Sequence, residues 1–346
     1  MSIPDDPAKL WRMALDSFRA GPVLVLSHDD ADGLSAAALL LRGLGRAGHE
    51  AVPRLVGRFE SAWNGPLLPG EWGGVVIADL GLGERLPHLD TPSLVLDHHV
   101  PRGTGDGAIV ISGAGLSPSP NTSLLAHRSV GTPPEESWVT ALGIIGDTNE
   151  SAGFPEMAEA RAHFRITHLR EATALVNAPR RSAHPDAQPA LNLILKSDGP
   201  ADLLSGRHPE TAILQAAREE VRREADHARK TAPLVAGELA LLRLHSACQV
   251  HPLAAQSWAR RLAPKVVIAA NDGFRPGFIH FAARGGARDL VRFFRERAPA
   301  GAGDSYGGGH PGASGGALPV AAWEPFIRGL GFGPEAAQFP RALEAA

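Results

Sequence analysis

The sequence of 346 residues contains one cysteine, Cys248, and one tyrosine. A single cysteine excludes a disulfide within the chain and a structural zinc site built from several thiolates. No apolar run approaches the roughly 18 residues that span a membrane. The N-terminal segment carries acidic residues and lacks the apolar stretch of a secretory signal. We therefore expect a cytoplasmic protein with no membrane partner.

The chain also lacks an excess of basic residues. Its 34 Lys and Arg stand against 37 Asp and Glu, a formal net charge of −3. Without a global positive field, a protein is poorly suited to gripping long duplex DNA, so any nucleic-acid surface must be local, and a small phosphorylated substrate is equally compatible. Hydrophobic residues make up 44% of the chain and charged residues 21%. This composition supports real cores, and the length suggests about two domains.

The first half of the chain alternates short apolar runs with helical patterns. Strands are expected at Val23–Ser27, Val75–Asp79 and Leu94–Asp97, and helices at Ser35–Leu44 and Glu135–Gly146. Short buried strands that alternate with helices are typical of a parallel α/β sheet.

The second half of the chain has a different pattern. Residues 155–235 are mostly helical, and the charged helix Glu210–Lys230 is expected to end before Pro233 and to connect two domains. Further strands are expected near residues 237–244, 265–271 and 277–284, followed by a helix near 288–297 and a glycine-rich loop at 307–315. The predicted organisation is an α/β domain over 1–208, a helical connector over 209–235 and a smaller α+β domain over 236–346.

Acidic and histidine side chains follow the predicted strands. His28, Asp30 and Asp32 come after the first strand, and Asp79 ends the second. Asp97, His98 and His99 come at the end of the third strand, and Asp147 follows an apolar helix. In an open α/β sheet, ligands bind outside the carboxyl ends of the strands, so these groups should meet in one cleft. Asp is also a common helix N-cap, which is the simpler explanation for any one of these motifs taken alone.

Carboxylates that are packed closely repel one another unless cations compensate them. The four charges of Asp30, Asp32, Asp79 and Asp147 match those of two divalent ions, and His98 adds a nitrogen ligand. Such a mixed set suits Mn²⁺ or Mg²⁺, with Co²⁺ or Zn²⁺ as substitutes. The sequence therefore predicts a two-metal centre that holds two Mn²⁺ ions.

These motifs resemble the DHH phosphoesterase superfamily. Asp97-His98-His99 is the triad that names it, and the stretches at 28–33, 78–81 and 146–148 are similar to its first, second and fourth motifs. The run Gly307–Gly315 is similar to the signature loop of the DHHA1 domain, with Ser314 where alanine is usual. The resemblance, to the nanoRNase, cyclic-dinucleotide phosphodiesterase and RecJ-like branches, implies a DHH domain, a DHHA1 domain and an active site in the cleft between them.

The resemblance also implies a role for each residue. Asp30 and Asp32 would bind different ions, Asp79 would bridge the pair, His98 and Asp147 would complete the two shells, and His28 is a candidate further ligand. The candidate catalytic residues are His99, facing the substrate phosphate, and Asp97, holding a histidine or strand end. Substrate would be bound by Arg284, Gly308, Gly309 and His310, since consecutive glycines let backbone N–H groups approach a phosphate. Asn121-Thr122-Ser123 opens a predicted helix, most simply as its N-cap, with a position beside the substrate as the alternative.

The expected activity is phosphodiester hydrolysis by a hydroxide that two metal ions generate from water. The substrates would be short: cyclic dinucleotides such as cyclic di-AMP, linear dinucleotides or nanoRNA. A RecJ-like 5′→3′ exonuclease on single-stranded nucleic acid is the alternative. A pyrophosphatase or exopolyphosphatase is less expected because those relatives have a different second domain. A non-catalytic scaffold is disfavoured because every candidate ligand is present, and a homodimer is compatible with the sequence.

Overall fold

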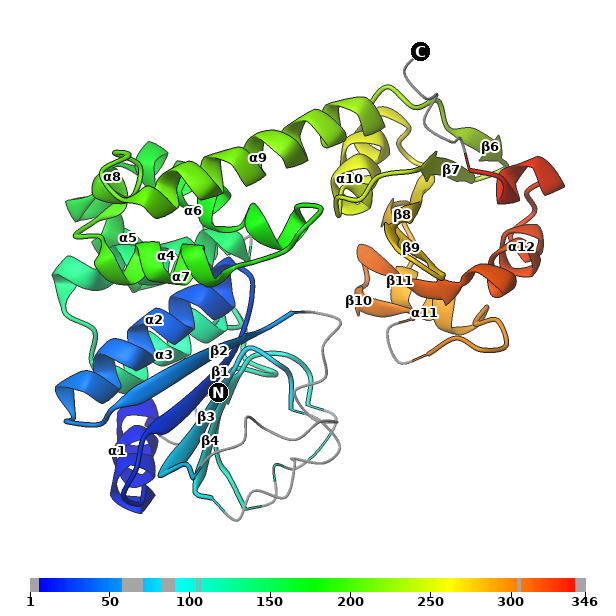
Figure 1. Cartoon of the computed structure of the whole chain (residues 1–346). Coiled ribbons are helices and arrows are strands. Elements are labelled where there is room, and N and C mark those ends of the chain that lie inside the picture. Colours follow the sequence, from blue (N-terminus) through cyan, green and yellow to red (C-terminus); the bar gives the residue numbers. More distant parts are fainter. Residues whose placement is uncertain are drawn as a thin grey trace. The chain divides into compact units, whose positions relative to one another are not determined.

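The structure is a computed structural model, and it describes residues 6–57, 71–82, 91–101, 103, 105, 107–147, 149–303 and 306–339. The chain divides into two compact units, one formed by Met1–Arg180 with Asp186–Ala216 and the other by Arg181–Pro185 with Ala217–Ala346. The division falls inside the long helix α9 (Pro209–Ala228), which the sequence predicted as the connector (Figure 1). Among the described residues, no helix combines the length and apolar character needed to cross a membrane.

A five-stranded parallel sheet forms the centre of the first unit, with strand order β2-β1-β3-β4-β5. The strands are β1 (Val23–His28), β2 (Ala51–Val56), β3 (Gly74–Ala78), β4 (Ser93–Asp97) and β5 (Ile109–Ser112). The three inner strands are apolar and almost wholly buried, as a parallel sheet covered on both faces requires. The predicted parallel α/β sheet is confirmed.

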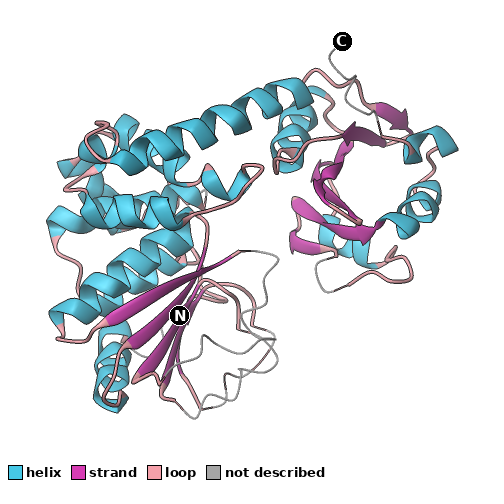
Figure 2. Ribbon diagram, viewed as in Figure 1, coloured by secondary structure: helices cyan, strands magenta, loops and turns pink. Residues whose placement is uncertain are grey.

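Helices build the larger core of the first unit (Figure 2). They are α1 (Pro7–Ser17), α2 (Ala31–Arg46), α3 (Thr122–Val130), α4 (Ser137–Gly146), α5 (Pro155–His163), α6 (Ile166–Val176), α7 (Gln188–Lys196) and α8 (Pro200–Leu203), with short 3₁₀ turns at Pro134–Glu136 and Pro179–Arg181. Helix α2 packs on both α3 and α4. Its buried alanines, Ala36, Ala37 and Ala38, allow this close packing. The three helices therefore converge beside the carboxyl end of β1, from which α2 continues.

The second unit contains a mixed six-stranded sheet with order β10-β11-β9-β8-β7-β6. Its strands are β6 (Leu234–Ala236), β7 (Leu239–Leu244), β8 (Val266–Arg275), β9 (Phe278–Gly285), β10 (Gly308–His310) and β11 (Ala313–Pro319). Strands β7 and β8 pair in parallel, and the other neighbours in this sheet pair antiparallel. Its helices are α10 (His251–Arg261), α11 (Leu290–Arg295), α12 (Val320–Gly329) and a 3₁₀ turn at Pro334–Ala337. Two cores, one aromatic and one lined by α10, stabilise this unit.

The glycine-rich run that was expected to be a loop is partly β-structure. Gly308 pairs with Gly315 and His310 with Ala313, so β10 and β11 form an antiparallel hairpin. Gly309 has a φ of 120°, and a Cβ at this position would overlap the carbonyl oxygen of Ala313. The absence of side chains lets the two strands approach closely, which outweighs the poor intrinsic strand preference of glycine.

Candidate metal centre

The candidate site of the first unit lies at the carboxyl edge of the parallel sheet. His28 ends β1, Asp79 follows β3, Asp97 ends β4 and Asp147 caps the C-terminus of α4. All six predicted metal ligands come together in three groups whose ligand atoms lie within 4.8 Å of one another. The groups are His28, Asp30 and Asp79; Asp79, His98 and His99; and Asp32, His98 and Asp147. The structure therefore assembles residues from four separate motifs into one cluster.

Asp30 divides its two carboxylate oxygens between the fold and the cluster. Oδ1 accepts hydrogen bonds from the backbone N–H groups of Asp32 and Gly33, at 3.1 and 3.2 Å, and so caps the N-terminus of α2. Oδ2 lies 3.2 Å from Nδ1 of His28. Asp30 can therefore cap the helix and also bind an ion, because Oδ1 caps α2 while Oδ2 faces the cluster.

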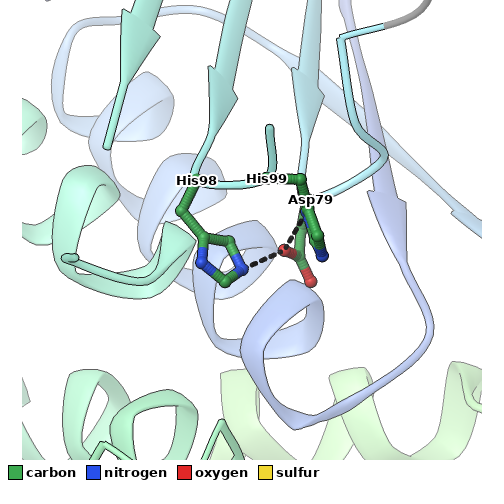
Figure 3. Close-up of side chains that lie close together, drawn as sticks. All are labelled: Asp79, His98 and His99. Carbon is green, nitrogen blue, oxygen red and sulfur yellow. Dashed lines mark ion pairs between the residues drawn. The ribbon is translucent and has the colours of Figure 1, made fainter. Parts of the chain in front are cut away.

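Asp79 lies between the two sides of the cluster. Its Oδ2 is 3.6 Å from Nδ1 of His28, whereas its Oδ1 is 3.5 Å from Nε2 of His98. Figure 3 shows Asp79 directed toward His98 and His99. Asp79 also has a φ of 63°, the left-handed conformation that few non-glycine residues adopt. This turn of the backbone directly after β3 aims the carboxylate across the ends of the strands.

His98 forms the other side of the cluster. Its Nε2 lies 3.5 Å from Oδ2 of Asp147 and 4.0 Å from Oδ2 of Asp32. Asp32 is 2% exposed, so the carboxylate is almost removed from water. Nε2 of His98 therefore faces three carboxylates, those of Asp79 after β3, Asp32 on α2 and Asp147 at the end of α4.

Asp97 holds the segment that carries the two histidines. Its Oδ1 accepts a hydrogen bond from the backbone N–H of His99 at 2.7 Å and lies 3.1 Å from Nδ1 of the same residue. Its Oδ2 accepts from the N–H of Gly81 at 2.7 Å, which ties the end of β4 to the turn after β3. An ionised carboxylate only accepts, so Nδ1 of His99 is assigned the proton. The half-exposed His99 ring lies against the His98 ring, with centroids 4.3 Å apart and ring planes tilted by 50°.

The crowding of charge shifts the proton affinities of these groups. Burial raises the pKa of Asp32, and the carboxylates of Asp79 and Asp147 raise it further. Burial likewise raises the pKa of Asp147. Burial lowers the pKa of the histidines, but neighbouring carboxylates outweigh this effect and raise the pKa of His28 to about 10 and that of His98 to about 9. The cluster therefore attracts cations strongly, and its oxygen and imidazole donors are a set that fits Mn²⁺, Mg²⁺ or Co²⁺.

Three parts of the site were not assigned to it from the sequence. Arg180 places Nη1 3.4 Å from Oδ2 of Asp30, and its buried Nε has no hydrogen-bond partner among the described residues. The N-terminus of α3, at Asn121, Thr122 and Ser123, contacts both Asp32 and Asp79. No motif marks Arg180, whereas the polar run at 121–123 was a usable signal. It was interpreted first as a helix cap, with a position beside the substrate as the alternative. Asp29 also joins the site, with Oδ1 3.5 Å from Nε2 of His28.

The predicted substrate-binding residues of the second unit lie on neighbouring strands. His310 of β10 pairs with Ala313 of β11, which pairs in turn with Arg284 of β9. Adjacent strands lie about 4.8 Å apart, so this row is roughly 10 Å wide. Gly308 and Gly309 precede His310 in β10, and Nη1 of Arg284 donates to the carbonyl oxygen of Ala283 at 2.9 Å. The His310 side chain lies outside what the structure describes.

Comparison with known proteins finds solved structures that share the fold of this chain. No protein-family model matches the chain, and no curated protein matches it. A structure of exonuclease RecJ bound to manganese aligns with a TM-score of 0.63 and 19% identity, covering 97% of this chain and 95% of that chain. RecJ from Thermus thermophilus in complex with Mn²⁺ aligns with a TM-score of 0.67 and 18% identity, over 98% of this chain and 56% of that chain.

The DHH domain of a protein assigned to a family of ribosomal proteins also aligns, with a TM-score of 0.64 and 14% identity, over 93% of this chain and 88% of that chain. At these identities, the three alignments show the fold. The chain therefore has the two-domain fold of RecJ and of DHH-domain proteins, which the sequence motifs had predicted.

Proposed function

We propose that this chain is a divalent-metal-dependent phosphodiesterase acting on short nucleotide substrates. One observation carries the proposal: the two oxygens of Asp79 face different nitrogen ligands, His28 on one side and His98 on the other. A carboxylate in this position suits two adjacent ions with Asp79 between them. RecJ structures described as complexes with Mn²⁺ or Mg²⁺ share the fold, which favours the same ions here.

The groups divide into two proposed ion sites. His28, Asp30 and Asp79 would hold one ion, and Asp32, His98 and Asp147 the other. Asp79 would also serve the second ion, because its Oδ1 lies 3.5 Å from Nε2 of His98. Ions bound there would lower the pKa of water and neutralise charge on phosphate oxygens. The preferred ion is proposed to be Mn²⁺, because imidazole is mixed with carboxylate in both sets.

The remaining residues of the first unit would act on the substrate. His99 is held by Asp97 and is half exposed, so its ring can hydrogen-bond to a phosphate oxygen or protonate the leaving oxygen. Arg180 adds a permanent positive charge beside Asp30, where it would hold that carboxylate and attract an anionic substrate.

The second unit is the proposed nucleotide-binding part of the chain. Arg284 offers a charged guanidinium, and the backbone of Gly308 and Gly309 can approach a phosphate closely because no side chain intervenes. A ligand spanning the row from Arg284 to His310 would match one or two nucleotides better than a long strand. We therefore favour dinucleotides, cyclic dinucleotides and nanoRNA as substrates.

A RecJ-like exonuclease is the second candidate, and the alignment with RecJ over 95% of one RecJ chain favours it. The test is a panel of substrates with Mn²⁺: cyclic di-AMP, cyclic di-GMP, RNA and DNA from two nucleotides upward, pyrophosphate and 3′-phosphoadenosine phosphate. Rates that fall steeply with strand length support the proposal. Processive degradation of long single strands supports the exonuclease. Absence of hydrolysis of every phosphodiester would overturn both.

A further inference from the structure

Helix α3 begins in an unusual way. Asn121 occupies its N-cap position, yet the Asn121 side chain accepts no capping hydrogen bond. An N-cap asparagine ordinarily accepts from backbone N–H groups of the first turn. Here the N–H groups of Thr122 and Ser123 donate to Oδ2 and Oδ1 of Asp32, both at 2.8 Å. A carboxylate from α2 therefore caps α3.

The Asn121 side chain also donates to the Asp32 carboxylate. Its Nδ2 donates to Oδ1 of Asp32 at 2.6 Å and to Oγ of Ser123 at 3.0 Å. Its own Oδ1 is buried and has no hydrogen-bond partner among the described residues. An unpaired buried carbonyl is energetically unfavourable. The orientation of the Asn121 amide therefore lowers local stability but provides the hydrogen bond to Asp32.

Thr122 connects the same helix end to the second carboxylate. Its Oγ1 donates to Oδ1 of Asp79 at 2.9 Å, and this is the Asp79 oxygen that faces His98. A β-branched side chain has few rotamers, so the hydroxyl is held in place. All three side chains of 121–123 are fully buried. The end of α3 thus fixes carboxylates that reach it from two different elements.

Helix α4 leaves space for this arrangement at Gly143. A Cβ at that position would lie 2.7 Å from Oδ1 of Asp32 and would overlap Oγ of Ser123. Any larger residue would displace the Asp32 carboxylate from α3. The close approach of α2, α3 and α4 is therefore built around this one buried acid.

We propose that residues 121–123 form a carboxylate clamp for the metal centre, and that Thr122 is a positioning residue that acts through Asp79. In the clamp, Oδ1 of Asp32 accepts from two donors, whereas Oδ2 accepts from one, the N–H of Thr122, and is the oxygen that lies on the side of His98. Oδ2 therefore keeps capacity for an ion. The clamp also sets the direction of Asp79 Oδ1. This inference rests on the proposed function, because it concerns how the proposed ligands are oriented.

The test compares Thr122→Val, which removes the hydroxyl and keeps the shape, with Thr122→Ser, which keeps the hydroxyl. Thr173→Val is the matched control, since Thr173 is buried and its hydroxyl donates to backbone carbonyl oxygens of helices α6 and α4. Mn²⁺ affinity and stoichiometry are measured by calorimetry on the full chain, together with kcat and KM on a dinucleotide. Groups that orient metal ligands typically contribute about 10- to 100-fold in metal affinity or activity.

We expect Thr122→Val to weaken Mn²⁺ binding by that factor, Thr122→Ser to restore most of it, and Thr173→Val to match the wild type. Unchanged Mn²⁺ affinity in a folded Thr122→Val variant would overturn the clamp while leaving the proposed function intact. Equal losses in Thr122→Val and Thr173→Val would overturn it too, because the effect would then be general destabilisation. If Thr122→Val fails to fold, Asn121→Ala carries the test, with the same loss expected. A wild-type chain that binds no Mn²⁺ overturns the proposed function itself.

Discussion

His28 and Asp79 face each other across the ends of neighbouring strands, with Nδ1 of the histidine 3.6 Å from Oδ2 of the aspartate. The strands β1 and β3 pair in parallel, so both side chains leave the sheet at the same edge. Asp79 reaches His98 with its other oxygen. The contact therefore links two sides of the cluster through one side chain, which makes Asp79 the most informative position to change.

Asp79→Asn should abolish turnover without unfolding the chain. Asparagine keeps the shape and tolerates the left-handed backbone, but it removes the charge that both proposed ions share. We expect a loss of kcat greater than about 100-fold, beyond what residues that merely support a ligand contribute. The metal-free variant should melt at a somewhat lower temperature. Burial raises the pKa of the Asp79 carboxyl, but its contacts with His28 and His98 outweigh this effect and lower that pKa, and the variant loses these stabilising contacts. A loss smaller than about tenfold would contradict the bridging assignment.

Mn²⁺ should restore activity to chelator-treated protein, and Ca²⁺ should not. The cluster offers imidazole and carboxylate donors together, whereas Ca²⁺ prefers a larger shell made only of oxygen. Added Mn²⁺ should also raise the melting temperature, since a ligand at about 100 times its Kd stabilises the folded state by about 2.7 kcal/mol. Thermal melts with EDTA, Mn²⁺, Mg²⁺ and Ca²⁺ measure this. Full activity in excess chelator would rule out a metal mechanism.

The stability of the metal-free protein should fall as the pH rises above neutrality. Carboxylates raise the pKa of His28 to about 10 and that of His98 to about 9, above the ordinary value of 6.5. The folded state then holds protons that the unfolded state releases. The two protonated histidines contribute fully to the free energy of unfolding below the histidine pKa of the unfolded state. This contribution is lost as the pH rises through the histidine pKa values of the folded state. Denaturant titrations in EDTA should show the free energy of unfolding falling over this range.

Metal binding should show the complementary behaviour. The same histidines must lose their protons to bind an ion, so Mn²⁺ affinity should increase with pH and binding should release protons. Calorimetry in two buffers with different ionisation enthalpies counts the protons. A free energy of unfolding that rises with pH in EDTA, or binding without proton release, would contradict the arrangement of charges at His28 and His98.

The parts of this site that the sequence could predict are those with a local signal. The strands β1, β3 and β4 are apolar runs that end in acids or histidines, so both the elements and their residues were predictable. The strand β2 was missed because it lies at the sheet edge, is half buried and contains Pro53 and Arg54, which obscure a strand pattern. Arg180 meets Asp30 only through the packing of distant segments, and no local pattern could indicate that contact.

Cys248 should be unreactive in the folded protein and dispensable for catalysis. Burial raises the pKa of its thiol to about 11, and the charges of Glu220 and Glu224 add to the effect. Little thiolate is then available near neutral pH. Iodoacetamide at about pH 8, close to the ordinary thiol pKa, should modify the protein only after addition of guanidinium, as mass spectrometry can measure. Cys248→Ala should retain wild-type turnover, and a large loss would point to a protein nucleophile.

His310→Ala should weaken the binding of dinucleotides and leave the metal centre intact. The strand register puts His310 in the same row as Arg284, in the unit that does not carry the metal cluster described above. A contact made equally in the ground state and the transition state raises KM without changing kcat when it is lost, whereas a transition-state contact lowers kcat. We expect a rise in KM of about tenfold, the loss of one hydrogen bond to a charged group. Kinetics on a dinucleotide measure it.

A small ester and a second histidine provide the controls for this prediction. Bis-p-nitrophenyl phosphate offers little for the second unit to hold, so its hydrolysis should hardly change in His310→Ala. His245→Ala should leave both substrates unaffected, because His245 is exposed in the same unit and pairs with Asp272. Equal impairment on both substrates, or loss of bound Mn²⁺, would show that His310 is not a substrate contact. No effect on either substrate would reduce the glycine-rich hairpin to a structural turn, and the preference for short nucleotides would then lose its main support.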